Sequence, residues 1–159
     1  MREVTGSTWT FQMIILFILI FAAFLALVLN YSKAYNIKNR MLTVLEKYEG
    51  FTTDSTKVIN NYNIQKGYNT KGTCPSDEAW IGAIDLDGTY EVSQNGENYY
   101  YCFIERSVNI NSVAYVYYDV IVFYRFNLPV LGDLFLYRIK GETKDFVGDN
   151  TRIYKKGEY

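Results

Sequence analysis

Met13–Leu29, MIILFILIFAAFLALVL, is an unbroken apolar run near the N-terminus, and no later part of the chain resembles it. With Trp9 ahead of the run and Tyr31 behind it, the stretch Trp9–Leu29 rises about 31 Å as an α-helix, roughly the thickness of a bilayer's hydrocarbon core. Aromatic rings at both ends suit the headgroup regions. The sequence therefore predicts a single-pass transmembrane helix over residues 9–30.

Two other interpretations of this run are weaker. A cleaved signal peptide has a basic N-terminal region, a shorter apolar core and small residues before the cut. Residues 1–12 instead carry one Arg and one Glu, and no small-x-small site follows the run. A core helix of a soluble domain would need a large domain to cover an all-round apolar surface. We therefore expect a retained anchor in the cell membrane, with residues 1–8 as a short tail.

Two signals for the orientation of this anchor disagree. Lys33, Lys38, Arg40 and Lys47 follow the span and only Arg2 precedes it, which by the positive-inside rule places the downstream domain in the cytoplasm. The N-terminal tail is very short, however, and almost uncharged. Both cysteines lie in the downstream domain and suit an oxidising compartment, so we favour an extracytoplasmic C-terminal domain.

The helical pattern continues beyond the apolar run. Apolar residues recur at three- and four-residue spacing between charged ones, at Ala34, Ile37, Met41, Leu45 and Tyr48. This is one apolar stripe on a solvated helix. We expect residues 31–50 to extend the transmembrane helix as an amphipathic one that ends at Gly50.

The rest of the domain, residues 51–154, combines a second helix with a sheet. The helix is expected at 54–66, capped by Asp54 or Ser55 and closed by Gly67. Strands follow from alternating apolar residues at 80–84, 89–93, 98–106, 113–127 and 134–140, with an edge strand at 151–155 and a tail at 155–159. The turn Gln94-Asn95-Gly96-Glu97 predicts a hairpin. The fold class is α+β, with an antiparallel sheet of about four to five strands.

Composition excludes some functions and favours others. The net charge is −1 and no basic stripe exists, which gives nucleic-acid binding no electrostatic support. Tyrosine is the outlier, with 16 in the chain. Tyrosine fits half-buried pleated surfaces and also surfaces that contact other proteins, and the first of these is the simpler interpretation.

The two cysteines, Cys74 and Cys102, are expected to form one disulfide that pins a loop to a strand. The alternative is two unrelated thiols in a reducing compartment. A metal site is not expected, because two thiols without any histidine supply too few soft ligands.

Catalytic chemistry has little support. The chain contains no histidine, which excludes Ser-His and Cys-His nucleophile pairs, and its acids are scattered. Asp119 interrupts an apolar strand, and alternation predicts that it is solvent-exposed or in a salt bridge. Asp85-Leu86-Asp87-Gly88 lacks the further ligands of a calcium loop and is explained by an ordinary turn. We expect no enzyme, no cofactor and no small-molecule substrate.

Together these features resemble type IV pilins and pseudopilins, most narrowly the TadE-like minor pseudopilins of tight-adherence pili. The resemblance rests on the helix Thr10–Tyr48, the cysteine pair, the segment Phe126–Gly132 and the later Lys140-Gly141-Glu142-Thr143. The sequence departs from the family where Phe11 stands five residues after Gly6, a position at which pilins carry Glu. Neither prepilin-peptidase processing nor the charge pair made by that Glu therefore follows from the resemblance.

The resemblance implies a structural, non-catalytic subunit of a pilus-like or secretion assembly. Its partners would be the lipid bilayer and other pilin-like subunits, packed against the helix at small residues, Ala22, Ala23 and Ala26. Those alanines can equally face lipid. The alternative function is a membrane-anchored extracytoplasmic binding module unrelated to pili.

Overall fold

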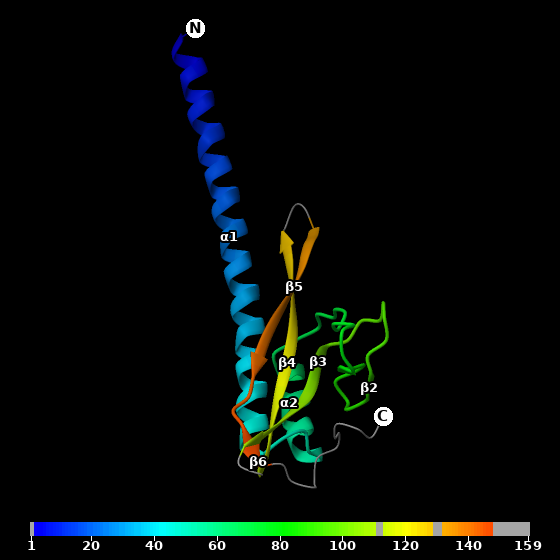
Figure 1. Ribbon diagram of the computed structural model, residues 1–159. Coiled ribbons are helices and arrows are strands. Elements are labelled where there is room, and N and C mark those ends of the chain that lie inside the picture. The colour runs from blue at the N-terminus through cyan, green and yellow to red at the C-terminus, as the bar shows by residue number, and fades with distance from the viewer. Residues whose placement is uncertain (1, 111–112, 129–131, 148–159) are drawn as a thin grey trace.

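The computed structural model describes residues 2–110, 113–128 and 132–147. Its elements are α1 (Arg2–Lys47), α2 (Thr53–Gln65), β1 (Ile81–Ala83), β2 (Tyr90–Val92), β3 (Tyr101–Ile110), β4 (Val113–Leu128), β5 (Gly132–Glu142) and β6 (Phe146–Val147). The C-terminal half of α1 lies along the sheet and its N-terminal half projects away from the domain (Figure 1). The predicted α+β layout is confirmed.

α1 is one continuous helix of 46 residues. It begins at Arg2, so most of the predicted tail is also helical. Large apolar side chains between Trp9 and Leu29 are exposed except Leu27, with Phe17 at 68% and Leu29 at 70%. The helix is long and apolar enough to span a membrane. Beyond Tyr31 the exposure changes to one side only, as the stripe of spaced apolar residues predicts.

The junction between α1 and α2 is built from backbone hydrogen bonds that differ in detail from the expected caps. The N–H of Gly50 donates to the carbonyl of Leu45 at 2.9 Å, and both Glu49, with φ 52°, and Gly50, with φ 130°, have positive φ next to the helix end. Thr52 caps α2, so the predicted caps Asp54 and Ser55 were wrong. Ser55 instead completes a capping box with Thr52, since its hydroxyl accepts from the N–H of Thr52 at 2.8 Å.

The sheet is antiparallel, in the order β2-β1-β3-β4-β5, with β6 also paired to β4. The predicted hairpin between 89–93 and 98–106 was wrong, because β1 lies between those two strands and pairs with both. The turn itself forms, with Gly96 at φ 90°. After the turn Tyr99 bridges to Gly72 instead of β2, which opens the space that β1 occupies.

Alternation along β4 divides the core into two layers. One face of β4 contributes Val116, Tyr118, Val120 and Val122 to the main cluster, which also holds the buried stripe of α1. Phe51, just after α1, stacks on Phe103 with ring centroids 3.6 Å apart. The opposite face carries a smaller cluster of Trp80, Tyr99, Cys102, Ile121 and Phe123. The alternation predicted over residues 113–127 thus yields one apolar face in the central part of β4, where the other face is buried too.

The last two strands of the chain, β5 and β6, differ from the strands predicted there. β5 begins at Gly132, two residues earlier than expected, and β6 is a short strand that the sequence did not suggest. The predicted edge strand at 151–155 lies outside the described residues.

The α1 stripe is expected to dominate the stability of the domain. Leu45 is fully buried, so Leu45→Ala removes apolar contacts and should lower the free energy of unfolding by about 2–5 kcal/mol. The matched control is Leu25→Ala, at an exposed position of the same helix. Denaturant unfolding of the detergent-solubilised chain, followed by near-ultraviolet circular dichroism, gives both values. Equal losses in the two variants would contradict the assigned packing.

Candidate functional site

The predicted bridge between Cys74 and Cys102 is present, with an S–S distance of 2.01 Å and the two Cα atoms 5.8 Å apart. Cys102 is buried on β3, whereas Cys74 belongs to the loop that follows α2. In this loop Gly72 lies directly against the ring of Phe123, where any added Cβ would come within 2.5 Å of it. The bridge therefore holds the loop across the second face of the sheet.

An ion cluster fastens the same loop at another point. Asp119 is only 2% exposed, and its Oδ2 accepts from Arg106 Nε at 2.6 Å and pairs with Lys140 Nζ at 3.0 Å. Arg106 also makes a two-point contact with the carboxylate of Glu78 in the loop. The hydrogen bonds to Glu78 and Asp119 raise the pKa of the Arg106 guanidinium. Of the two outcomes expected for Asp119, the salt bridge is confirmed and solvent exposure is wrong.

Tyrosine hydroxyls connect α2 to the sheet inside the core. Asn60 donates to the Tyr90 hydroxyl at 3.1 Å and accepts from the Tyr101 hydroxyl at 2.9 Å, and the two hydroxyls lie 2.9 Å apart. Burial raises the pKa of Tyr90. These rings fill the core while their polar ends satisfy one another, which is a structural role and requires no ligand.

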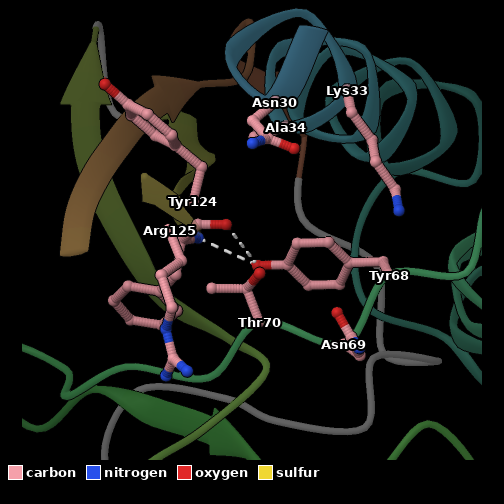
Figure 2. A pocket seen from close by; sticks show the side chains of 9 residues that line it. Asn30, Lys33, Ala34, Tyr68, Asn69, Thr70, Tyr124 and Arg125 are labelled. Carbon is pink, nitrogen blue, oxygen red and sulfur yellow. Dashed lines mark hydrogen bonds between the residues drawn. The ribbon is translucent and has the colours of Figure 1, made fainter. Parts of the chain in front are cut away.

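A small cavity lies where α1 leaves the domain, lined by Asn30, Lys33, Ala34, Tyr68, Asn69, Thr70, Phe123, Tyr124 and Arg125 (Figure 2). Tyr68 reaches from the loop to the backbone of β4. Its hydroxyl accepts from the N–H of Phe123 at 3.0 Å and lies 2.8 Å from the carbonyl of the same residue. Burial raises the pKa of Tyr68. Lys33 reaches the loop from the other side and donates to the carbonyl of Gly67 at 2.7 Å.

The size and chemistry of this cavity favour a structural joint over a ligand site. Its volume is about 70 Å³, well below the ~300–1,000 Å³ usual for ligand pockets. The described parts of the chain contain no group of three or more His, Cys, Asp or Glu residues that could hold a metal ion.

Asp85 accepts three backbone N–H groups in a turn, and the bond from Thr89 is the main reason that its pKa is lowered.

The three alanines suggested for helix packing lie on the projecting half of α1. Ala22 is exposed, whereas Ala23 and Ala26 are half-buried. Spacing of 3.6 residues per turn places Ala23 and Ala26 on the helix face that carries Ala34 and Ile37. Of the three alanines, only Ala22 lies off this face and is open to contact with another helix.

No protein-family model, curated protein or solved structure matches the chain. Function therefore has to be argued from the residues and their arrangement. The sequence identified the bridge and the stripe, but it missed Tyr68, Lys33 and the partners of Asp119. These contacts join segments far apart in the chain. Only the salt bridge of Asp119 had a signal in the sequence, because Asp119 is a charged residue inside an apolar strand.

The disulfide should contribute stability by restricting the unfolded chain. The paired cysteines are separated by 28 residues, so the double variant Cys74→Ser/Cys102→Ser is expected to lose about 3–4 kcal/mol of unfolding free energy. Comparison of the oxidised and dithiothreitol-reduced wild-type chain is the matched control. If reduction leaves the denaturation midpoint unchanged, the bridge does not fasten the loop.

The buried carboxylate of Asp119 gives a second expectation. Asp119→Asn removes the charge shared by Arg106 and Lys140 and is expected to destabilise the domain by about 3 kcal/mol, because the cations lose their buried partner. The control is Asp87→Asn in an exposed turn, expected within about 0.5 kcal/mol of wild type. Thermal denaturation at neutral pH compares the two, and similar melting temperatures would argue against the cluster.

Proposed function

We propose that this chain is a membrane-anchored structural subunit of a pilus-like or secretion assembly, with an architecture of the minor-pseudopilin kind. One observation carries the proposal. A single uninterrupted helix is apolar on all sides over its first half and packed into the core of a small antiparallel sheet over its second half. A stand-alone anchored module has no need of such continuity, because a flexible linker would tether it equally well.

The projecting half of α1 supplies the surface for assembly. Its exposed Leu, Ile and Phe side chains can face lipid or other apolar helices. Helices in a bilayer associate through close packing at small residues, which favours the side of α1 that carries Ala22. We place the domain outside the cytoplasm, and the disulfide between Cys74 and Cys102 supports this orientation because such bridges persist in oxidising compartments.

For the alternative, an anchored binding module, neither of the two hollows found among the described residues offers a matching site. The cavity beside Tyr68 is too small for a ligand of drug size, and the groove between α1 and α2, at about 280 Å³, is open to solvent and also lies below the ~300–1,000 Å³ usual for ligand pockets. The structural proposal requires no pocket and therefore agrees better with the described surface.

Cysteine cross-linking of the full chain in native membranes tests the proposal. The bridge occupies both native cysteines, so a new thiol reports alone. Ala22→Cys is expected to form cross-links to neighbouring subunits on oxidation. The control is Val28→Cys, which lies about 120° away around the helix and is also exposed. In addition, Ala22→Phe should weaken co-purification of the assembly about tenfold, the equivalent of about 1.4 kcal/mol.

Two outcomes would contradict the proposal. Absence of cross-links at both positions, with the chain running as a monomer in mild detergent, would support the anchored-module alternative. Equal cross-linking at both positions would indicate random collision without a packed face.

A further inference from the structure

The β4–β5 hairpin runs alongside α1, and two contacts fix its course. Gly141 on β5 lies against Leu42 and Lys38, where an added Cβ would come within 2.8 Å of Leu42. Further along, the ring of Tyr124 on β4 meets Tyr31 of α1 edge-on, with centroids 5.7 Å apart. On β5, Gly141 lies four residues from Tyr137, which pairs with Tyr124, and four strand residues rise about 13 Å. From the level between Lys38 and Leu42 to Tyr31, α1 rises by about the same distance, so β5 and α1 run side by side toward the projecting half of α1.

The hairpin continues beyond this second contact. Its ladder extends from Tyr124 paired with Tyr137 to Leu128 paired with Gly132, which is about 13 Å further. Counted from Tyr31, which contacts Tyr124, the same rise of about 13 Å along α1 reaches about residue 22. Figure 1 shows the hairpin beside the projecting half of the helix. Within residues 8–29, the half-buried positions are Ala23, Ala26 and Leu27, on the side of α1 that the hairpin follows.

Three consecutive side chains on β5 give this distal hairpin an exposed apolar and aromatic surface. Phe135, Leu136 and Tyr137 are 58%, 43% and 46% exposed. Aromatic contacts continue the surface, with Tyr124 stacked on Tyr137 at 5.1 Å and Phe135 near Tyr137 at 6.1 Å. Tyrosine and other aromatic rings in such a band are typical of the membrane–water interface.

Basic residues lie at the level of the contact between Tyr31 and Tyr124. Arg125 follows Tyr124 on β4, and Lys33 lies two residues beyond Tyr31 on α1. Lys33 and Lys66 line a groove of about 280 Å³ between α1 and α2, next to Leu29 at the end of the apolar run. Cations beside an aromatic band are suited to the phosphates of lipid headgroups.

The length of α1 agrees with this level. No charged residue occurs from Val4 to Ser32, a stretch that rises about 43 Å as a helix and exceeds a ~30 Å hydrocarbon core by about 13 Å. The excess equals the reach of the hairpin beyond Tyr124. A bilayer whose acyl boundary lies at about residue 23, within about 2 Å of the level of the hairpin end, covers residues 4–23 of α1 with hydrocarbon and leaves every charge of α1 outside it. The hydrocarbon core then lies about six residues nearer the N-terminus than the predicted span 9–30, and the apolar residues 24–29 lie in the headgroup layer beside the hairpin.

We propose that the distal β4–β5 hairpin is a second membrane-contacting element, which crosses the headgroup layer of the leaflet on the domain's side. Phe135, Leu136 and Tyr137 contact lipid there, and Lys33, Lys66 and Arg125 lie at phosphate level. The described end of the ladder, Leu128 paired with Gly132, lies at the acyl boundary, because the open edges of a two-stranded ribbon cannot enter hydrocarbon without unpaired backbone groups. The inference rests on the membrane-spanning helix alone and holds whether or not the chain joins an assembly.

A lipid-quenching experiment on the full chain tests this proposal. The chain is reconstituted into phosphatidylcholine–phosphatidylglycerol vesicles with an environment-sensitive nitrobenzoxadiazole label on Phe135→Cys, or on Leu136→Cys as a second reporter. Both native cysteines are bridged, so the label reaches only the new thiol. Phe17→Cys gives the value inside the span, and Lys144→Cys gives that of an exposed site near the opposite end of β5.

We expect blue-shifted emission at positions 135 and 136, with quenching by lipids brominated near the glycerol backbone that exceeds the value at Phe17→Cys, because Phe17 lies deeper in the span. Emission and quenching equal to those at Lys144→Cys would overturn the proposal. A blue shift without lipid quenching would also overturn it, because another protein, such as a second copy of this chain, would then cover the hairpin.

Discussion

A helix that contacts lipid over one half and packs against a protein core over the other must change its surface without a break in the helix. It is apolar around its whole circumference in the first half and apolar along a single stripe in the second. In this chain the change occurs after Tyr31, and the stripe of Ile37, Met41 and Leu45 then meets β4. Every other element takes its place from that contact. β3 and β5 flank β4, α2 folds back beside α1 through the Thr52 cap, and the loop carrying Cys74 closes the far face of the sheet.

The abundance of tyrosine has two separate explanations in the structure. Tyr68, Tyr90 and Tyr101 are buried or largely buried, and their hydroxyls bind backbone groups or one another, so they hold the loop and α2 to the sheet. Tyr31 and Tyr124 instead gather where the helix leaves the domain, with their rings in contact. A composition count cannot separate these groups. Position relative to the apolar run does, because the second group lies level with its end.

Local patterns predicted the local features of this fold. The continuous helix, its stripe and the alternation along β4 could be read from spacing, and the bridge from having only two cysteines. Contacts distant in sequence could not be predicted. β1 lies between β2 and β3, and Tyr99, which follows the turn after β2, pairs with Gly72 of the loop. Asp119 is buried beneath Arg106, which also binds Glu78 of the loop. Such arrangements depend on how the loop crosses the sheet, which no short window of sequence encodes.

The absence of any break in α1 from Arg2 to Lys47 also has a mechanical consequence. With no joint between span and sheet, the helix acts as a rigid lever about 69 Å long. Any tilt of its buried end turns the whole domain by the same angle, and any force on the domain is transmitted undamped to the bilayer. Tilt of the helix therefore changes the height of the sheet above the lipid, whereas rotation about the bilayer normal leaves that height unchanged.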